Sequence, residues 1–304
     1  MMPKILKYIA YAILFVVSFL LFLYWMFPYE ILKDRVASAI EEPLARQVEV
    51  SIGDIEPYYF TGLEISDMKL VGRTNGEARP LAEFGKVRVR AALFSLIFGN
   101  PRISFLIKSG KGEIAGSAKQ TDEGFDIDVD LDDFDVGSVK WLESQSGIKL
   151  SGKLSGNVTL KIDRARPVRT AGKVDLSLDD FKLGQSQLTA GGANIPIPDM
   201  VITKGRGSRL KFTIDKGAVN IDEFKLSDGD LGLDLKGKLF LSTVLSNYRL
   251  NLTGSFRASD KFTEAFPLLF MVEKQKQADG SYPLTVTGRL SEPSIKVGTF
   301  TLPL

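Results

Sequence analysis

Apolar and polar residues alternate along most of the chain from Val48 onward, and this pattern restricts the fold more than any other feature. In the clearest run, Phe125, Ile127, Val129 and Leu131 are separated by single aspartates. Successive side chains of a strand point to opposite faces, so each such run has one apolar and one polar face. Similar runs occupy residues 48–52, 87–91, 158–162, 174–178, 210–214, 231–235 and 250–252. The pattern predicts a mainly β fold with a large twisted antiparallel sheet, because parallel sheets show continuous apolar runs.

Three short segments have a helical spacing of apolar residues instead. Residues 30–44 predict a helix that Pro43 limits, and residues 93–98 predict about one turn before Gly99. Residues 262–274 predict a longer helix that Pro267 starts or kinks. A recurring element, glycine followed by a basic and an aliphatic residue, appears for example at Gly152 and Gly237. We interpret it as a strand position at which glycine permits a bulge or a close approach.

Residues 8–27 form an uncharged apolar run without glycine or proline, which predicts an uncleaved membrane anchor. The run ends in aromatic residues and Pro28, as expected at a membrane interface, whereas a signal peptide has a shorter apolar core. A buried soluble helix is the alternative. The residues expected to mark the anchor are Tyr8, Leu14, Leu20, Trp25 and Phe27.

The anchor divides the chain into three parts. Residues 1–29 are a short tail and the transmembrane helix, residues 30–47 a juxtamembrane helix, and residues 48–304 a β-rich body. Lysine and arginine are nearly balanced across the anchor, so the positive-inside rule decides little. A short charged N-terminus before one anchor and a long body predicts a cytoplasmic N-terminus and a body outside the cytoplasm. Residues 190–198 are either an internal boundary or one long loop in a continuous sheet.

The composition excludes catalytic and metal sites that depend on cysteine or histidine. The chain has no cysteine and no histidine. Thiolate metal sites, cysteine nucleophiles, histidine-ligated zinc and histidine general bases are therefore impossible. From Glu30 onward 37 basic and 37 acidic residues balance, and a neutral body argues against nucleic acid as a partner. We therefore expect no enzyme activity, no metal and no cofactor.

An acidic strand is the strongest charge cluster of the sequence. Eight acidic residues lie within residues 122–135, and Asp126, Asp128 and Asp130 alternate with apolar residues. Carboxylates are the ligands that calcium prefers, but a calcium loop curls its ligands around one ion, whereas these three lie along a strand. We favour a solvated strand face that resists aggregation over a calcium site.

The apolar face of such a sheet needs a cover, and a few short helices cannot cover a dozen strands. The sheet either folds on itself as a sandwich or curls into a trough whose apolar interior stays open to acyl chains or to a partner. We favour the trough. The residues expected to line it are Phe125, Ile127, Val129, Leu131, Leu210, Phe212, Ile214, Leu250 and Leu252.

Several segments in order along nearly the whole chain carry a family resemblance. They are Phe27-Pro28-Tyr29 after the anchor, the glycine and aliphatic pattern of residues 48–53 and 59–70, residues 87–99, the paired glycines of residues 148–156, and the terminal residues 287–293. With these the chain resembles the type II secretion system protein N family of Gram-negative bacteria in its longer form. It is also similar to AsmA-like inner-membrane proteins, relatives of TamB.

The resemblance implies a single-pass inner-membrane protein with a periplasmic β body and no catalytic residues. It implies an accessory, non-enzymatic component of type II secretion that binds partner secretion proteins or lipid. The alternative is AsmA-like phospholipid transfer or maintenance of the envelope. The short length and the Phe27-Pro28-Tyr29 junction favour the secretion role, and the expected partners are the inner membrane, secretion-system proteins and phospholipid.

Overall fold

The computed structural model describes residues 4–26, 30–41, 48–59, 61–74, 77–92, 101–140, 143, 147–163, 165–190, 193–242 and 247–302. The helices are α1 (Lys4–Met26), α2 (Glu30–Glu41) and α5 (Asp260–Ala265), with the 3-10 helices η1 (Val136–Ser138), η2 (Pro167–Arg169) and η4 (Pro267–Gln275). The strands up to the middle of the chain are β1 (Val48–Ser51), β2 (Asp54–Tyr58), β3 (Gly62–Thr74), β4 (Glu77–Ala91), β5 (Arg102–Ser109), β6 (Gly112–Gln120), β7 (Gly124–Asp135), β8 (Leu150–Asp163) and β9 (Ala171–Leu183). The later strands are β10 (Ser186–Ala190), β11 (Ala193–Ile197), β12 (Met200–Val201), β13 (Ser208–Asp215), β14 (Ala218–Leu226), β15 (Leu231–Phe240), β16 (Arg249–Ala258), β17 (Tyr282–Arg289), β18 (Glu292–Val297) and β19 (Phe300–Thr301). The prediction of a mainly β chain with few short helices is confirmed.

One antiparallel sheet contains 17 of the strands in the described part of the chain. Strands that follow one another in sequence are neighbours from β3 to β9 and again from β13 to β19, and β9 pairs directly with β13. Both β1 and β2 pair with β3, and the short β12 extends the β9 side. The hairpin β10–β11 forms a separate two-stranded sheet. The prediction of a large antiparallel sheet is therefore confirmed.

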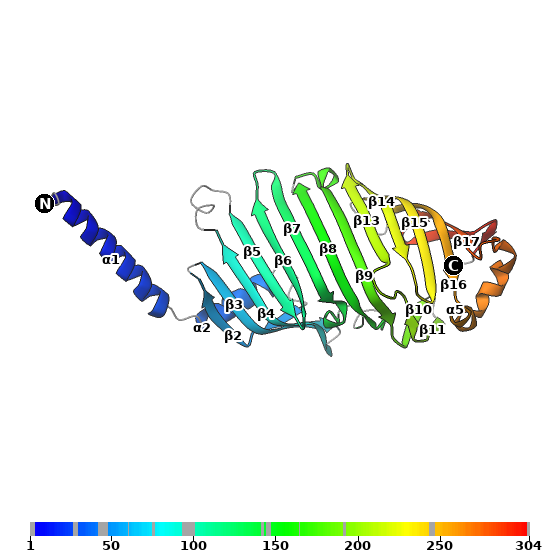
Figure 1. Cartoon of the computed structure of the whole chain (residues 1–304), viewed down its shortest axis with the longest axis horizontal. Coiled ribbons are helices and arrows are strands. Elements are labelled where there is room, and N and C mark those ends of the chain that lie inside the picture. The colour runs from blue at the N-terminus through cyan, green and yellow to red at the C-terminus, as the bar shows by residue number, and fades with distance from the viewer. Residues whose placement is uncertain are drawn as a thin grey trace.

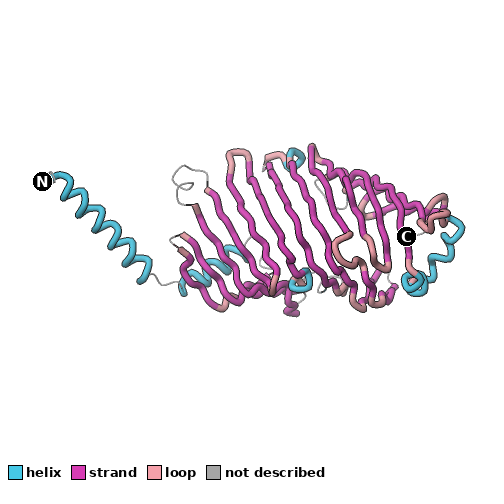
Figure 2. The backbone as a smooth tube through the Cα atoms, viewed as in Figure 1, coloured by secondary structure: helices cyan, strands magenta, loops and turns pink. Residues whose placement is uncertain are grey.

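The strands lie side by side in one broad twisted layer (Figure 1 and Figure 2). Helix α1 projects from the end of this layer where β2–β4 lie, and α5 lies at the opposite end (Figure 1). Of residues 190–198, the expected boundary or loop, Ala190 ends β10, residues 193–197 form β11, and residues 191–192 lie outside the described residues. The sheet continues past them because β9 and β13 pair directly.

Two of the three predicted helical segments coincide with helices of the structure. Residues 30–44 contain α2, whose described part ends at Glu41, and the segment predicted at residues 93–98 lies outside the described residues. Residues 262–274 hold two helices, because α5 ends at Ala265 and Pro267 opens η4. Proline lacks the amide hydrogen that an uninterrupted helix would need at this position. The Oγ of Ser259 caps α5 by accepting a hydrogen bond from the Phe262 amide at 3.2 Å.

Helix α1 holds most of the expected anchor. The side chains of Tyr8, Leu14 and Trp25 are exposed, while the Leu20 side chain and Phe27 lie outside the described residues. Within the described residues, no helix is long and apolar enough to cross a membrane.

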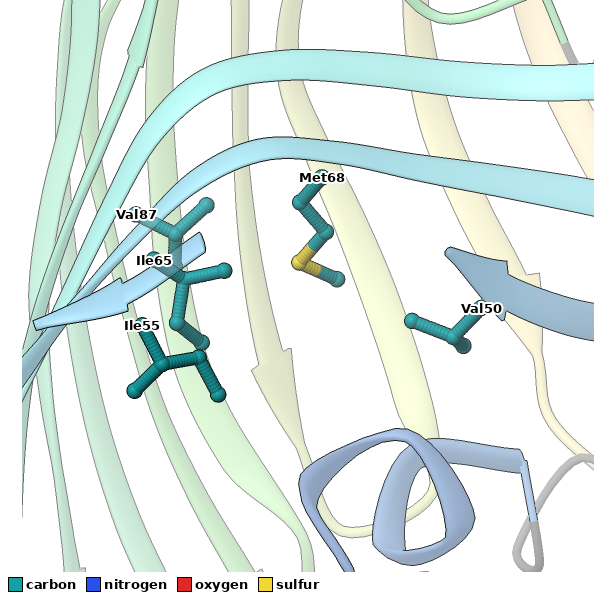
Figure 3. Close-up of a cluster of buried hydrophobic side chains, with 5 residues drawn as sticks. All are labelled: Val50, Ile55, Ile65, Met68 and Val87. Carbon is teal, nitrogen blue, oxygen red and sulfur yellow. The ribbon is translucent and has the colours of Figure 1, made fainter. Parts of the chain in front are cut away.

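Two clusters of buried apolar side chains lie near the two ends of the sheet. At the first end, Leu32 and Val36 of α2 pack against a cluster formed by Val50, Ile55, Ile65, Met68 and Val87 (Figure 3). At the other end, Val272 of η4, which is 1% exposed, packs with Phe256, Tyr282 and Val297. The Tyr282 hydroxyl also donates a hydrogen bond to Glu273 of η4 at 3.1 Å, which holds this helix in place. Each helix thus covers apolar sheet residues near one end of the layer.

Candidate functional site

The pairing register places apolar residues in continuous rows across the sheet. Residues directly opposite each other on antiparallel strands have side chains on the same face. The central row crosses thirteen strands, from β3 to β9 and from β13 to β18, through Leu63, Val89, Phe105, Gly116, Val129, Val158, Val174, Phe212, Ile221, Gly237, Leu252, Val286 and Ile295. We call the side of the sheet that carries this row the apolar face.

Two flanking rows share this face and lie two residues away along each strand, except that a bulge in β14 places Phe224 three residues from Ile221. One crosses the same strands through Ile65, Val87, Ile107, Ile114, Leu131, Gly156, Leu176, Leu210, Phe224, Leu235, Gly254, Leu284 and Val297. The other runs from β4 through Ala91, Ile103, Ala118, Ile127, Leu160, Gly172, Ile214, Val219, Leu239, Leu250, Gly288 and Pro293. None of the three rows contains a charged residue or a side chain that can hydrogen-bond. The apolar face therefore offers only non-directional hydrophobic contacts.

All nine residues expected to line a groove lie on this face. Val129, Phe212 and Leu252 belong to the central row, and the flanking rows hold the next five: Leu131, Leu210, Ile127, Ile214 and Leu250. Phe125 lies one row further out, opposite Gln120 and Ile162. The structure thus brings together residues that are up to 127 positions apart in sequence (Phe125 to Leu252). Their role as a lining stays a prediction.

Partial exposure distinguishes the middle of the apolar face from its ends. Eight of the nine predicted residues are half-buried, and Leu252 is buried. The two buried clusters under α2 and η4 lie toward the ends. A side chain between two packed sheets is normally fully buried. The half-burial of these side chains in β7 and β13 is instead the degree of burial expected when only neighbouring side chains of the same layer cover them.

Glycines in these rows let neighbouring strands and their side chains approach closely. The ring of Phe105 lies where a Cβ on its opposite neighbour Gly116 would be, so the phenyl group covers the backbone of β6. Gly156 has φ +141°, and a Cβ there would overlap the carbonyl oxygen of Asp175. Register shifts accompany Gly152 and Gly237, which have φ +146° and +145°. The interpretation of glycine as permitting a bulge or a close approach is confirmed at both positions: Gly152 lies in a bulge of its own strand, and Gly237 lets the Asn251 carbonyl approach closely opposite a bulge in β14.

The acidic strand lies on the opposite, polar face of β7. Asp126 is opposite Lys119 on β6 and Lys161 on β8, and Asp130 accepts a hydrogen bond from the Asn157 amide at 2.9 Å. Among the described residues, no group of three or more acidic side chains is placed to hold a metal ion. The carboxylates are instead arranged along the strand beside lysine and asparagine side chains of the neighbouring strands.

Asp179 is a buried carboxylate that the sequence-based prediction missed. It is 7% exposed, its Oδ1 has no hydrogen-bond partner among the described residues, and its Oδ2 lies 3.6 Å from Nε of Arg206. Burial raises the pKa of this carboxyl, and Arg206 opposes the increase only in part. The consecutive acids Asp179 and Asp180 break the alternation, and Asp180 has φ +52°, so this break was the available signal of an irregular strand.

The chain matches no protein-family model, no curated protein and no solved structure. The resemblance to the secretion system protein N family and to AsmA-like proteins therefore stays a prediction.

Proposed function

We propose that the body is a curled, open trough that holds lipid acyl chains on its apolar face and that it acts without catalysis. The observation that carries the proposal is the set of three uncharged rows, which cross the sheet with half-exposed side chains in the middle. Burying apolar surface contributes about 25 cal/mol per Å². An uncovered face of this size therefore favours an apolar occupant.

Acyl chains suit this face better than a protein segment for two reasons. The rows offer no hydrogen-bond donor or acceptor, so they match a ligand that is hydrocarbon alone. Thirteen strands at about 4.8 Å per strand give a face on the order of 60 Å long, which exceeds the hydrocarbon thickness of a bilayer. Such a face can hold several acyl chains or let one lipid move along it.

We propose further that α1 anchors this body in the inner membrane with the body in the periplasm. The support is the uncharged run of residues 8–27, which extends to Phe27, beyond the described part of α1. A helix over all twenty residues of this run would be about 30 Å long at about 1.5 Å per residue, the thickness of a hydrocarbon core.

A role as an accessory component of type II secretion is a second proposal that rests on the resemblance. The apolar face would then bind an apolar segment of a partner secretion protein. A gene neighbourhood rich in secretion pseudopilin genes would support this role, whereas phospholipid bound to the purified chain supports the trough.

Native mass spectrometry of the detergent-extracted full chain tests the proposed function. We expect the wild-type protein to retain phospholipid, because detergent removes lipid more slowly from a long apolar face than from a flat polar surface. The Ile127→Asp variant, which places a carboxylate in the middle of the face, should retain much less. A folded wild-type chain without bound lipid, or equal retention by the variant, would contradict the proposal.

A further inference from the structure

A hollow of about 1040 Å³ lies where β15 and β17 end and β16 begins. Its walls include Phe240, Arg249, Asn251, Thr287 and Arg289. Phe240 is the last residue of β15, Arg249 the first of β16 and Arg289 the last of β17, so the hollow lies at one rim of the sheet. Among the described residues, no acidic side chain lines it.

Two arginines lie side by side in the wall of this hollow. Arg249 and Arg289 are directly opposite on β16 and β17, and the exposed ring of Phe240 is the next member of the same row. Among the described residues, neither guanidinium group has an ion pair or a hydrogen bond. Glu292 is opposite Arg289 on β18, but it forms no ion pair with it and does not line the hollow. Like charges directly opposite each other destabilise a sheet, and an anion bound between them would relieve this repulsion.

The other walls indicate what kind of anion fits. Asn251 and Thr287 add hydrogen-bonding side chains, while Phe240 and Leu250 add apolar surface. A phosphate ester joined to hydroxyl and hydrocarbon groups uses all of these contacts, whereas inorganic phosphate uses only the polar ones. Among the described wall residues, none is a carboxylate that could pair with an ammonium group, which argues against an ethanolamine headgroup.

The hollow also adjoins the apolar face at this rim. Its residues Leu250 and Gly288 are opposite each other in a flanking row of the apolar face. Arg249 and Arg289, one residue further along each strand, have their side chains on the polar face. The chain connects β16 to β17 at the far end of these strands, through α5 and η4, so no connection joins them here. A headgroup in the hollow can therefore extend its acyl chains around the rim to the apolar rows.

We propose that this hollow binds the phosphate headgroup of an anionic phospholipid whose acyl chains lie on the apolar face. This site rests on the proposed function and adds a headgroup selectivity to it. The two guanidinium groups provide the charge, and the amide and hydroxyl groups of Asn251 and Thr287 hydrogen-bond the headgroup.

The test measures which lipids the purified full chain retains from an equimolar mixture of phosphatidylglycerol and phosphatidylethanolamine, by native mass spectrometry. We expect wild type to retain mainly phosphatidylglycerol. The double variant Arg249→Gln, Arg289→Gln should retain lipid but lose this preference by about tenfold or more, since each charge-assisted hydrogen bond contributes strongly. The matched control Lys173→Gln, Lys182→Gln removes two exposed charges from β9 and should keep the wild-type ratio.

The outcomes separate this site from the proposed function. Retained lipid without a headgroup preference, or a preference that survives in the double arginine variant, overturns the headgroup site and leaves the trough in place. A chain that retains no lipid of either class overturns both. Inorganic phosphate should not displace phosphatidylglycerol at millimolar concentration; displacement would identify a free-phosphate site and contradict the lipid headgroup.

Discussion

Placing a carboxylate in the middle of the apolar face distinguishes an open trough from a dry core. Ile127 is half-buried on β7, opposite Ala118 and Leu160. Full burial of an isoleucine side chain contributes about 1.5–3 kcal/mol, so a half-buried one contributes about 0.8–1.5 kcal/mol. The new carboxylate of Ile127→Asp stays hydrated on the open side and adds little to this loss. We therefore expect the melting temperature to fall by only a few degrees.

The matched control is Ile65→Asp on β3. Ile65 belongs to a flanking row of the same face but is 2% exposed because α2 covers it. An unpaired carboxylate buried there should cost several kcal/mol and unfold this end of the body. Circular dichroism melting of the two full-length variants in detergent compares them directly. If Ile127→Asp is as destabilising as Ile65→Asp, the middle of the face is a dry core and the reasoning fails.

Four further predictions concern local features. Gly156→Ala should lower the free energy of unfolding by about 3 kcal/mol or more, because φ +141° and contact with the Asp175 carbonyl exclude a Cβ. In the control Gly232→Ala, where there is space for a Cβ, the melting temperature should change by under about 2 °C. Asp179→Asn should raise the melting temperature at pH 7, because burial raises the pKa of this carboxyl and its ionisation therefore weakens the folded state as pH rises. The gain should vanish near pH 3, where the aspartic acid and the asparagine are both neutral. A difference in melting temperature that stays unchanged from pH 7 to pH 3 would contradict the burial argument. Replacing the three alternating aspartates of β7 by asparagine should leave melting nearly unchanged with or without calcium, and a calcium-dependent stabilisation lost in the variant would restore the calcium site. Alkaline phosphatase fused after Leu304 should be active in cells, and an inactive, intact fusion would contradict the periplasmic body.

The sheet could be predicted because its signal is local. A period of two is visible within five residues, so runs such as Phe125–Leu131 identify strands without any tertiary information. The break at Pro267 was also readable, since proline removes a helical hydrogen bond wherever the segment packs. The long strands β3 and β4 were harder, because Pro80 and Gly72 interrupt their alternation, and only pairing with neighbours carries the strands through.

The sequence predicted which residues of the candidate site have apolar side chains on one side of a strand. It did not predict which residues of other strands lie beside them. Alternation tells which side chains of one strand point together, so Ile127 and Phe212 could be assigned to apolar sides separately. Register and direct pairing of β9 with β13 were needed to place both sides on one face. The opposed pair Arg249 and Arg289 depends on register alone, since these positions are forty apart in sequence with two helices between them.

Photo-crosslinking in intact cells tests the central claim most directly. A photoreactive residue at Val129 or Phe212 lies on the apolar face, whereas the same residue at Asp128 or Lys211 lies on the polar face of the same two strands. The account predicts phospholipid adducts from the first two positions and background yields from the other two. Equal lipid yields from both faces, or none from Val129 and Phe212 in the folded protein, would contradict an apolar face that holds acyl chains.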